Sequence, residues 1–208
     1  MAEPSYPLSL PTSPSNFVTS EWRIIRTVAY TESPFTYGQQ VAKYQGSVWQ
    51  TTVTLPPMNR ADAGAWQSFF MQLNGRFGTF LLGDPDAKTI QGGATTVISV
   101  NGDHSVGAYD VVVDGANTST VIFKKGDYVQ FGSGASSKLH MIVADITSDA
   151  SGNATLQIEP SLKTALTDDD VITYSNTKAV MRMDANELGW NANNVSLYGI
   201  SFSCTESL

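Results

Sequence analysis

The segment from residue 46 to residue 86 constrains the fold of this 208-residue chain most strongly, because it carries start and stop signals for three elements in a row. Residues 46–55 alternate in side-chain character with period two, the pattern of a strand with one buried face. Pro56 and Pro57 follow, and neither can donate a backbone hydrogen bond, so the strand must end there. A second strand is expected over residues 77–82, before a Gly-Asp-Pro-Asp run.

Between these strands the sequence predicts one amphipathic helix, over about residues 59–74. Asn59 can accept hydrogen bonds from the free N–H groups of the first turn, and Asn74 with Gly75 supplies a left-handed exit. Large apolar side chains at i, i+3, i+4 and i+7 form one stripe, and burying each is worth roughly 1.5–3 kcal/mol, so the helix should lie on a sheet. The predicted core joins this stripe to the strands: Trp49, Val53, Leu55, Trp66, Phe69, Phe70, Leu73, Phe80 and Leu82.

Residues 1–20 predict an extended arm. Four prolines in this segment exclude a helix. The segment also contains more large apolar residues than a solvated tail would need. Tyr6, Leu8, Leu10 and Phe17 are spaced along it. We therefore expect the arm to dock on a surface, and a neighbouring subunit is the candidate.

The character of the chain changes near residue 90 and again near residue 177. Residues 21–89 contain the helix and a hairpin-like pair of strands that is expected to form most of the sheet beneath it. Residues 90–176 predict several short strands joined by turns, a spacing typical of a small antiparallel barrel or sandwich. The last strand, within residues 195–204, is most easily stabilised by joining the first sheet. Residues 90–176 would then be inserted into a domain formed by residues 21–89 and 177–208.

Charge and cysteine content exclude several classes of protein. The net charge is −7 and the basic residues are scattered, which argues against specific nucleic-acid binding. Cys204 is the single cysteine, so no intrachain disulfide and no thiolate metal cluster can form. The N-terminus lacks the basic and apolar regions of a signal peptide, and no stretch approaches the roughly 18 apolar residues of a membrane span. We expect synthesis and folding in the cytoplasm of the producing cell.

No residue pattern predicts a catalytic centre. His140 alternates with apolar residues in a probable strand, and His104 lies in a probable loop; neither adjoins a nucleophile motif. The three aspartates at 168–170 lack the alternating spacing of a calcium loop and favour a solvated turn. Cys204 has no histidine near it in sequence and is expected to be an inert packed thiol. The predicted catalytic, metal and cofactor sites are therefore none.

A family resemblance rests on several runs of sequence in both halves of the chain. They are YPLSLP at 6–11, SPFT at 33–36, VTLPPM at 53–58, AWQSFF at 65–70, GTFLLGDP at 78–85, KGDYVQF at 125–131 and ASGNATL at 150–156. Together they resemble the distal tail proteins of bacteriophages with long, non-contractile tails, also called tail-hub or minor tail proteins. The resemblance covers nearly the whole chain. Its motifs are structural and lack the specificity of a catalytic signature.

The resemblance implies a mainly β protein: a β-sandwich tail-hub domain with one helix, and an inserted, small antiparallel β-barrel-like (OB-like) domain. It implies a structural virion protein without enzymatic activity or cofactor, located at the tail tip after synthesis in the host cytoplasm. Its partners would be copies of itself in a ring, usually a hexamer, the tail tube protein and the tail-tip proteins. DNA would pass through the lumen without specific binding, and no membrane would be involved.

Two alternatives remain open at this stage. The inserted domain could be a carbohydrate-binding module for adsorption. Separately, Tyr109, Trp190 and Tyr198 could form a sugar-stacking surface, although packing in a core or an interface is the favoured interpretation of these rings. A glycan-cleaving enzyme would need a facing pair of carboxylates, and nothing in the sequence selects such a pair.

The acidic net charge of the chain suits the DNA channel that the resemblance implies, because a wall that attracts phosphates would retain the polymer.

Overall fold

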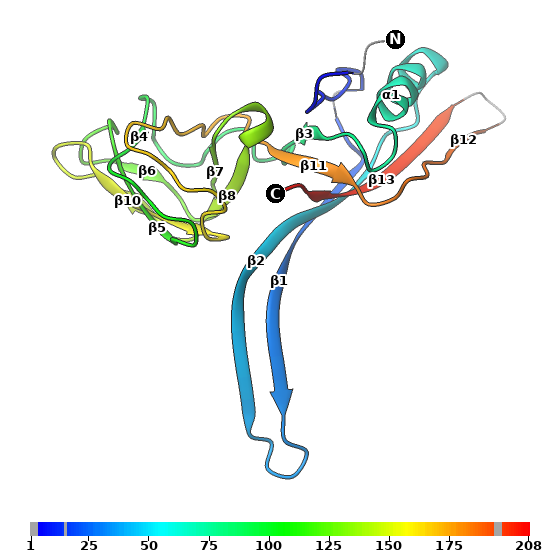
Figure 1. Ribbon diagram of the computed structural model, residues 1–208. Coiled ribbons are helices and arrows are strands. Elements are labelled where there is room, and N and C mark those ends of the chain that lie inside the picture. Colours follow the sequence, from blue (N-terminus) through cyan, green and yellow to red (C-terminus); the bar gives the residue numbers. More distant parts are fainter. Residues whose placement is uncertain (1–3, 15, 194–196) are drawn as a thin grey trace.

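The structure is a computed structural model that describes residues 4–14, 16–193 and 197–208. The described part of the chain is mainly β, with curled sheets and one α-helix. Figure 1 shows a sheet beside the helix, a second group of strands, and a two-stranded projection that extends away from both. Residues 194–196, where the predicted last strand begins, lie outside the described residues.

The main sheet has the strand order β1-β2-β13-β11-β3, with β12 also paired to β13. All of its pairings are antiparallel. The last strand lies between β2 and β11, so it joins the first sheet as the sequence suggests. The strands are β1 (Thr19–Glu32), β2 (Gln39–Thr54), β3 (Phe80–Leu82), β11 (Ala179–Met183), β12 (Trp190–Ala192) and β13 (Tyr198–Glu206).

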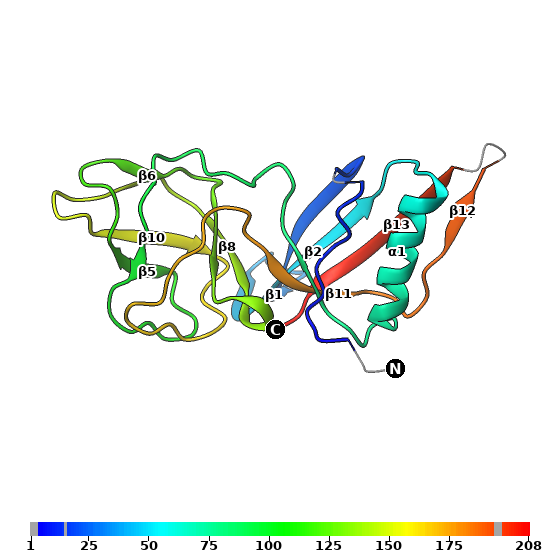
Figure 2. The same cartoon turned by 90° about the horizontal axis from the view of Figure 1, so that it is seen from above.

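The helix α1 (Arg60–Leu73) has both predicted caps. The Asn59 side chain accepts hydrogen bonds from the backbone N–H groups of Ala61 and Asp62, at 2.8 and 3.1 Å. Asn74 adopts the left-handed conformation, with φ 51°. Figure 2 shows α1 beside β13, on the main sheet.

The predicted core is buried in full, and Trp66 lies at its centre. The Trp66 ring contacts those of Phe69, Phe70 and Phe202, with centroids 5.8 to 6.1 Å apart. Trp49, Val53, Leu55, Trp66, Phe69, Phe70, Leu73, Phe80 and Leu82 are all at most 6% exposed. The helix therefore covers the inner part of the main sheet through one aromatic cluster.

The segment between β3 and β11, residues 83–178, is called the inserted domain here because those two strands are paired neighbours in the main sheet. It has a five-stranded sheet of order β4-β5-β10-β8-β7 and a two-stranded sheet, β6-β9, around a hydrophobic core of its own. Its elements are β4 (Ser99–Val100), β5 (Asp110–Asp114), β6 (Val121–Phe123), β7 (Tyr128–Phe131), the 3-10 helix η1 (Gly134–Ser136), β8 (Lys138–Ile142), β9 (Ile146–Thr147) and β10 (Ala154–Glu159).

The N-terminal arm docks on its own chain, which corrects the expectation of a neighbouring subunit. Tyr6, Leu8, Leu10 and Phe17 all pack against the core beneath α1. Leu8 also bonds to both sides of β3: its N–H donates to the Thr79 carbonyl at 2.8 Å, and its carbonyl accepts from Leu81 N–H at 2.9 Å. The apolar spacing correctly indicated a docked segment, but the same chain supplies the surface.

Candidate subunit interface

The outer part of the β1–β2 hairpin projects from the molecule and is called the finger here, residues 27–46 (Figure 1). Every residue from 25 to 46 is exposed except Ser33, which is half-buried. The hairpin pairing was expected, but only its inner part underlies the helix. The expectation that the two strands form most of the sheet beneath α1 is therefore wrong for their outer halves.

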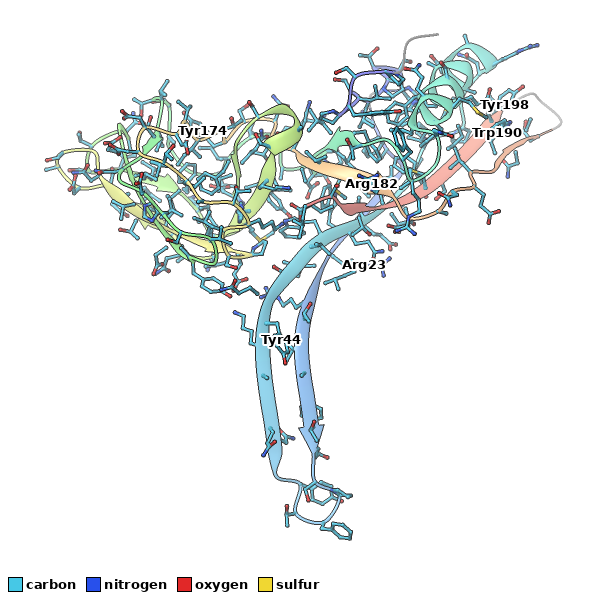
Figure 3. All side chains as sticks on the ribbon, in the orientation of Figure 1. Arg23, Tyr44, Tyr174, Arg182, Trp190 and Tyr198 are labelled. Atoms are coloured by element: carbon cyan, nitrogen blue, oxygen red, sulfur yellow. The ribbon has the colours of Figure 1, made fainter. Side chains whose placement is uncertain are left out.

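The finger carries large apolar side chains that nothing in the chain covers. Val28, Tyr30 and Val41 are 48%, 56% and 63% exposed, and in the pairing register Tyr30 lies opposite Val41. At the tip, Phe35 is 92% exposed. The remaining large apolar residues of the finger are Tyr37 and Tyr44, the latter labelled in Figure 3. An exposed apolar surface of this extent marks an interaction site more often than a solvated face.

The two edges of the main sheet are treated differently. At one end the arm covers the edge of β3 through the Leu8 hydrogen bonds described above. At the other end β1 is the last strand among the described residues, and its 14-residue edge is open. The second edge of the finger is also open, because β13 pairs with β2 only between Gln50 and Thr54. Unpaired strand edges are templates for pairing with another chain.

The inserted domain supports the finger at its base. The Arg26 guanidinium forms an ion pair with Glu159 of β10, with 2.9 Å between Nη1 and Oε2. The Lys43 ammonium lies 4.4 Å from the centroid of the Tyr109 ring. Beyond these contacts the finger extends without support from the rest of the described chain, as Figure 1 shows.

The negative charge is concentrated away from the finger and the main sheet. The inserted domain, residues 83–178, contains twelve acidic and six basic residues, whereas the rest of the chain contains seven acidic and six basic ones. Within the finger only Glu32 and Lys43 are charged. A partner surface of either charge would therefore meet little electrostatic repulsion at the finger.

His140 has a structural environment. Its side chain is fully buried, Nδ1 lies 2.7 Å from the Pro160 carbonyl oxygen, and its ring packs against Phe131. Burial lowers the pKa of His140 to about 3, and the nearby charges of Lys163 and Lys138 act in the same direction. A group that stays neutral throughout the physiological pH range and lies away from solvent is a poor general base.

His104 accepts a hydrogen bond at Nε2 from the Val112 N–H, at 3.2 Å. The carboxylates of the 168–170 run are used in turns: Asp168 accepts from Gly102 N–H and Asp170 from Thr167 N–H. Among the residues that the structure describes, no group of three or more His, Cys, Asp and Glu side chains could hold a metal ion. Cys204 is buried, and that burial raises the pKa of its thiol.

The three candidate stacking aromatics are not brought together. Trp190 and Tyr198 lie near one end of the main sheet, as Figure 3 shows, on the paired strands β12 and β13. Tyr109 belongs to the inserted domain and lies beneath Lys43 at the base of the finger. The proposed sugar-stacking surface therefore has no common platform for these three rings.

A hollow lies beside the C-terminal end of α1. Glu187 is the one acidic or basic residue in its lining, so this hollow contains no facing pair of carboxylates. The lining residues are Phe70, Met71, Asn74, Gly75, Met183, Ala185, Asn186, Glu187, Leu188 and Trp190.

Within the described ranges, no helix has the length and apolar character needed to cross a membrane. No protein-family model matches this chain, and no curated protein matches it either.

Proposed function

We propose that this chain is a structural protein that forms a ring at the distal end of a phage tail tube and connects the tube to the tail-tip or receptor-binding apparatus. The observation that carries the proposal is the combination of an open β1 edge with an uncovered apolar finger. The sequence resemblance supplies the biological setting. In this proposal the main sheet with α1 belongs to a β-sandwich tail-hub domain, and residues 83–178 form an OB-like barrel.

The proposed ring makes use of the asymmetry of the main sheet. One edge is covered by the chain's own arm and the other is open, so in the proposed ring the open edge and the finger of one copy contact a different surface of the next. Contacts between different surfaces of identical copies are heterologous, and they generate a ring when the rotation closes. We propose six copies, as in the proteins that the sequence resembles, with the tail tube protein and tip proteins as axial neighbours.

The charge distribution changes the net charge that we expect for the wall of the channel. The part of the chain outside residues 83–178 has a net charge of only −1, so a ring built from the main sheet would have a nearly neutral wall. Such a wall neither attracts nor strongly repels DNA phosphates. The excess negative charge would then lie on the inserted domain. Passage of DNA without specific binding remains part of the proposal, on this revised basis.

The oligomeric assembly tests the proposal. The full chain would be concentrated and studied by mass photometry and negative-stain electron microscopy, with Val41→Lys as the interface variant. Val97→Lys is the matched control, because Val97 is 70% exposed in the inserted domain and Val41 is 63% exposed in the finger. We expect closed rings from the wild-type chain and from Val97→Lys, and about tenfold fewer or none from Val41→Lys.

Two-fold dimers would contradict the proposed ring, as would open filaments or equal assembly by the two variants.

The proposed location at the tail tip is tested separately, by gold-labelled antibodies against the chain on the virions that contain it. Label at the end of the tail distant from the head supports the proposal. Label on the head, or hydrolysis of a glycan by the purified chain, would contradict it.

A further inference from the structure

The junction between the main sheet and the inserted domain contains a buried ion pair. Glu206, at the end of β13, has a side chain that is 0% exposed, and Lys163 of the inserted domain has one that is 7% exposed. The Lys163 ammonium donates to Glu206 Oε2, which also accepts from the Trp49 backbone N–H at 3.1 Å. One carboxylate oxygen thus joins three segments: β2, β13 and the loop after β10.

Further polar and aromatic contacts cross this junction. The Trp49 indole N–H donates to the Leu139 carbonyl of β8 at 2.9 Å, and the Lys138 ammonium donates to the Ser207 carbonyl at the same distance. The Trp49 ring also contacts the Tyr128 ring, with centroids 5.8 Å apart. Tyr128 and the fully buried Leu139 also belong to the hydrophobic core of the main sheet, so the junction combines apolar contacts with buried polar bonds.

The junction also has incompletely satisfied polar groups. Within the described part of the chain, the buried side-chain polar atoms without a hydrogen-bond partner in the protein are Thr51 Oγ1, His140 Nε2 and Glu206 Oε1. Thr51 lies two residues from Trp49 on the same face of β2, opposite Cys204 in the pairing register. His140 is the residue after Leu139 in β8. All three atoms thus belong to the strands that meet at this junction.

These polar features lower the free-energy cost of opening the junction. A buried ion pair loses in desolvation much of what it gains in attraction, and burial lowers the pKa of Lys163 despite its partner. Polar atoms without partners regain hydrogen bonds as soon as water enters.

We infer that Lys163 and Glu206 form a latch, and that the inserted domain separates from the main sheet at this junction, exposing Tyr128 and Leu139, while the rest of both cores stays folded. The latch sets the orientation of the inserted domain and, through Arg26 and Glu159, the support at the base of the finger. This inference goes beyond the proposed function and does not depend on ring formation.

Amide-resolved hydrogen exchange by NMR on the monomeric full chain tests the latch. The reporter is the Trp49 amide, whose acceptor is the Glu206 side chain. Reference amides come from α1 and from β5, one in each core. In the wild-type chain we expect the Trp49 amide to exchange faster than both references. In Lys163→Met it should exchange about tenfold faster again, with the references unchanged.

Two further variants complete the experiment. Glu206→Gln keeps an acceptor for the Trp49 amide but removes the charge that pairs with Lys163, so it should accelerate the same amide; it also serves if Lys163→Met does not fold. Lys125→Met, an exposed lysine of the same domain, should change nothing. The latch is overturned if the Trp49 amide and the α1 amides accelerate together, or if neither latch variant changes the exchange of Trp49.

Discussion

The inner and outer halves of the β1–β2 hairpin are continuous strands in very different environments. In the inner half of β2, Trp49 and Val53 are buried under the helix-covered core. In the outer half of the same strand, Val41 is 63% exposed and its cross-strand partner Tyr30 is 56% exposed. The backbone pairing is shared, so the difference lies in what covers the side chains.

This contrast teaches that strand formation and strand stabilisation are separate matters. A two-stranded ribbon is marginally stable in water when no third strand or helix packs on it. The inner half has β13 and α1 as neighbours, whereas the outer half has neither. Apolar side chains on the finger therefore contribute little to the folding of one copy; in the proposed ring they contact another copy.

The largest expected effect comes from removing the cover of the inner half. Trp66→Ala would leave a large cavity between α1 and β13, and it should lower the free energy of unfolding by about 3–5 kcal/mol. Tyr44→Ala, an aromatic truncation in the finger, should change it by less than about 0.5 kcal/mol. Urea unfolding of both variants at neutral pH measures the difference. Similar losses of stability in the two variants would contradict the conclusion that only the inner half of the hairpin is stabilised by covering side chains.

A pH series extends the comparison of buried and exposed regions to the inserted domain, where the buried His140 resists protonation in the folded chain. The pKa of His140 is lowered to about 3, whereas in the unfolded chain it has the ordinary value near 6.5. The contribution of His140 is therefore fully present above pH 6.5. It is lost by about 1.4 kcal/mol per pH unit as the pH falls toward 3, since only the unfolded chain binds the proton.

Unfolding free energies measured at pH 7, 6 and 5 for wild type and His140→Gln isolate this slope. The wild-type chain should lose stability more steeply than the variant over this range. Parallel curves would show that His140 is accessible to protons in the folded state.

Two valines of β2 provide the matched pair. Val53 is 0% exposed in the inner half and Val41 is 63% exposed in the outer half. Val53→Ala should cost about 2 kcal/mol, from lost burial and a small cavity. Val41→Ala should change stability by less than about 0.5 kcal/mol. Thermal unfolding of dilute, monomeric samples checks both values, and equal shifts would show that the finger is covered within the single chain.

The smallest expected loss is at the start of the helix that covers the inner half. Asn59→Ala removes the acceptor for two backbone N–H groups, and it should cost about 1 kcal/mol. Asn59→Asp keeps a side-chain acceptor and should retain most of the stability. Chemical unfolding of the two variants is the measurement. A loss in Asn59→Asp as large as in Asn59→Ala would exclude capping as the reason.

The sequence predicts those parts of the fold whose signals are local. The helix has its cap at Asn59, its exit at Asn74 and an apolar stripe centred on Trp66, all within one short window. The nine core residues follow from strand alternation and helical spacing, and all nine are buried.

The finger, the arm and the junction could not be predicted in the same way. Alternation shows which side chains share a face, but whether that face is covered depends on where β13 stops along β2. The arm's apolar spacing does not say which copy of the chain supplies the surface. Lys163 and Glu206 are 43 residues apart, and neither has a local pattern that marks a buried charge.

The insertion point has an evolutionary consequence. The chain leaves the main sheet at Leu82 and returns beside it, since Leu82 and Ala179 are cross-strand partners. Recombination could therefore exchange the whole excursion for a different module, or for a tight turn, without altering the connectivity of the remaining strands. A replacement module would need an acceptor for the Trp49 indole N–H and a partner for Glu206, whereas a tight turn would leave both groups exposed to water.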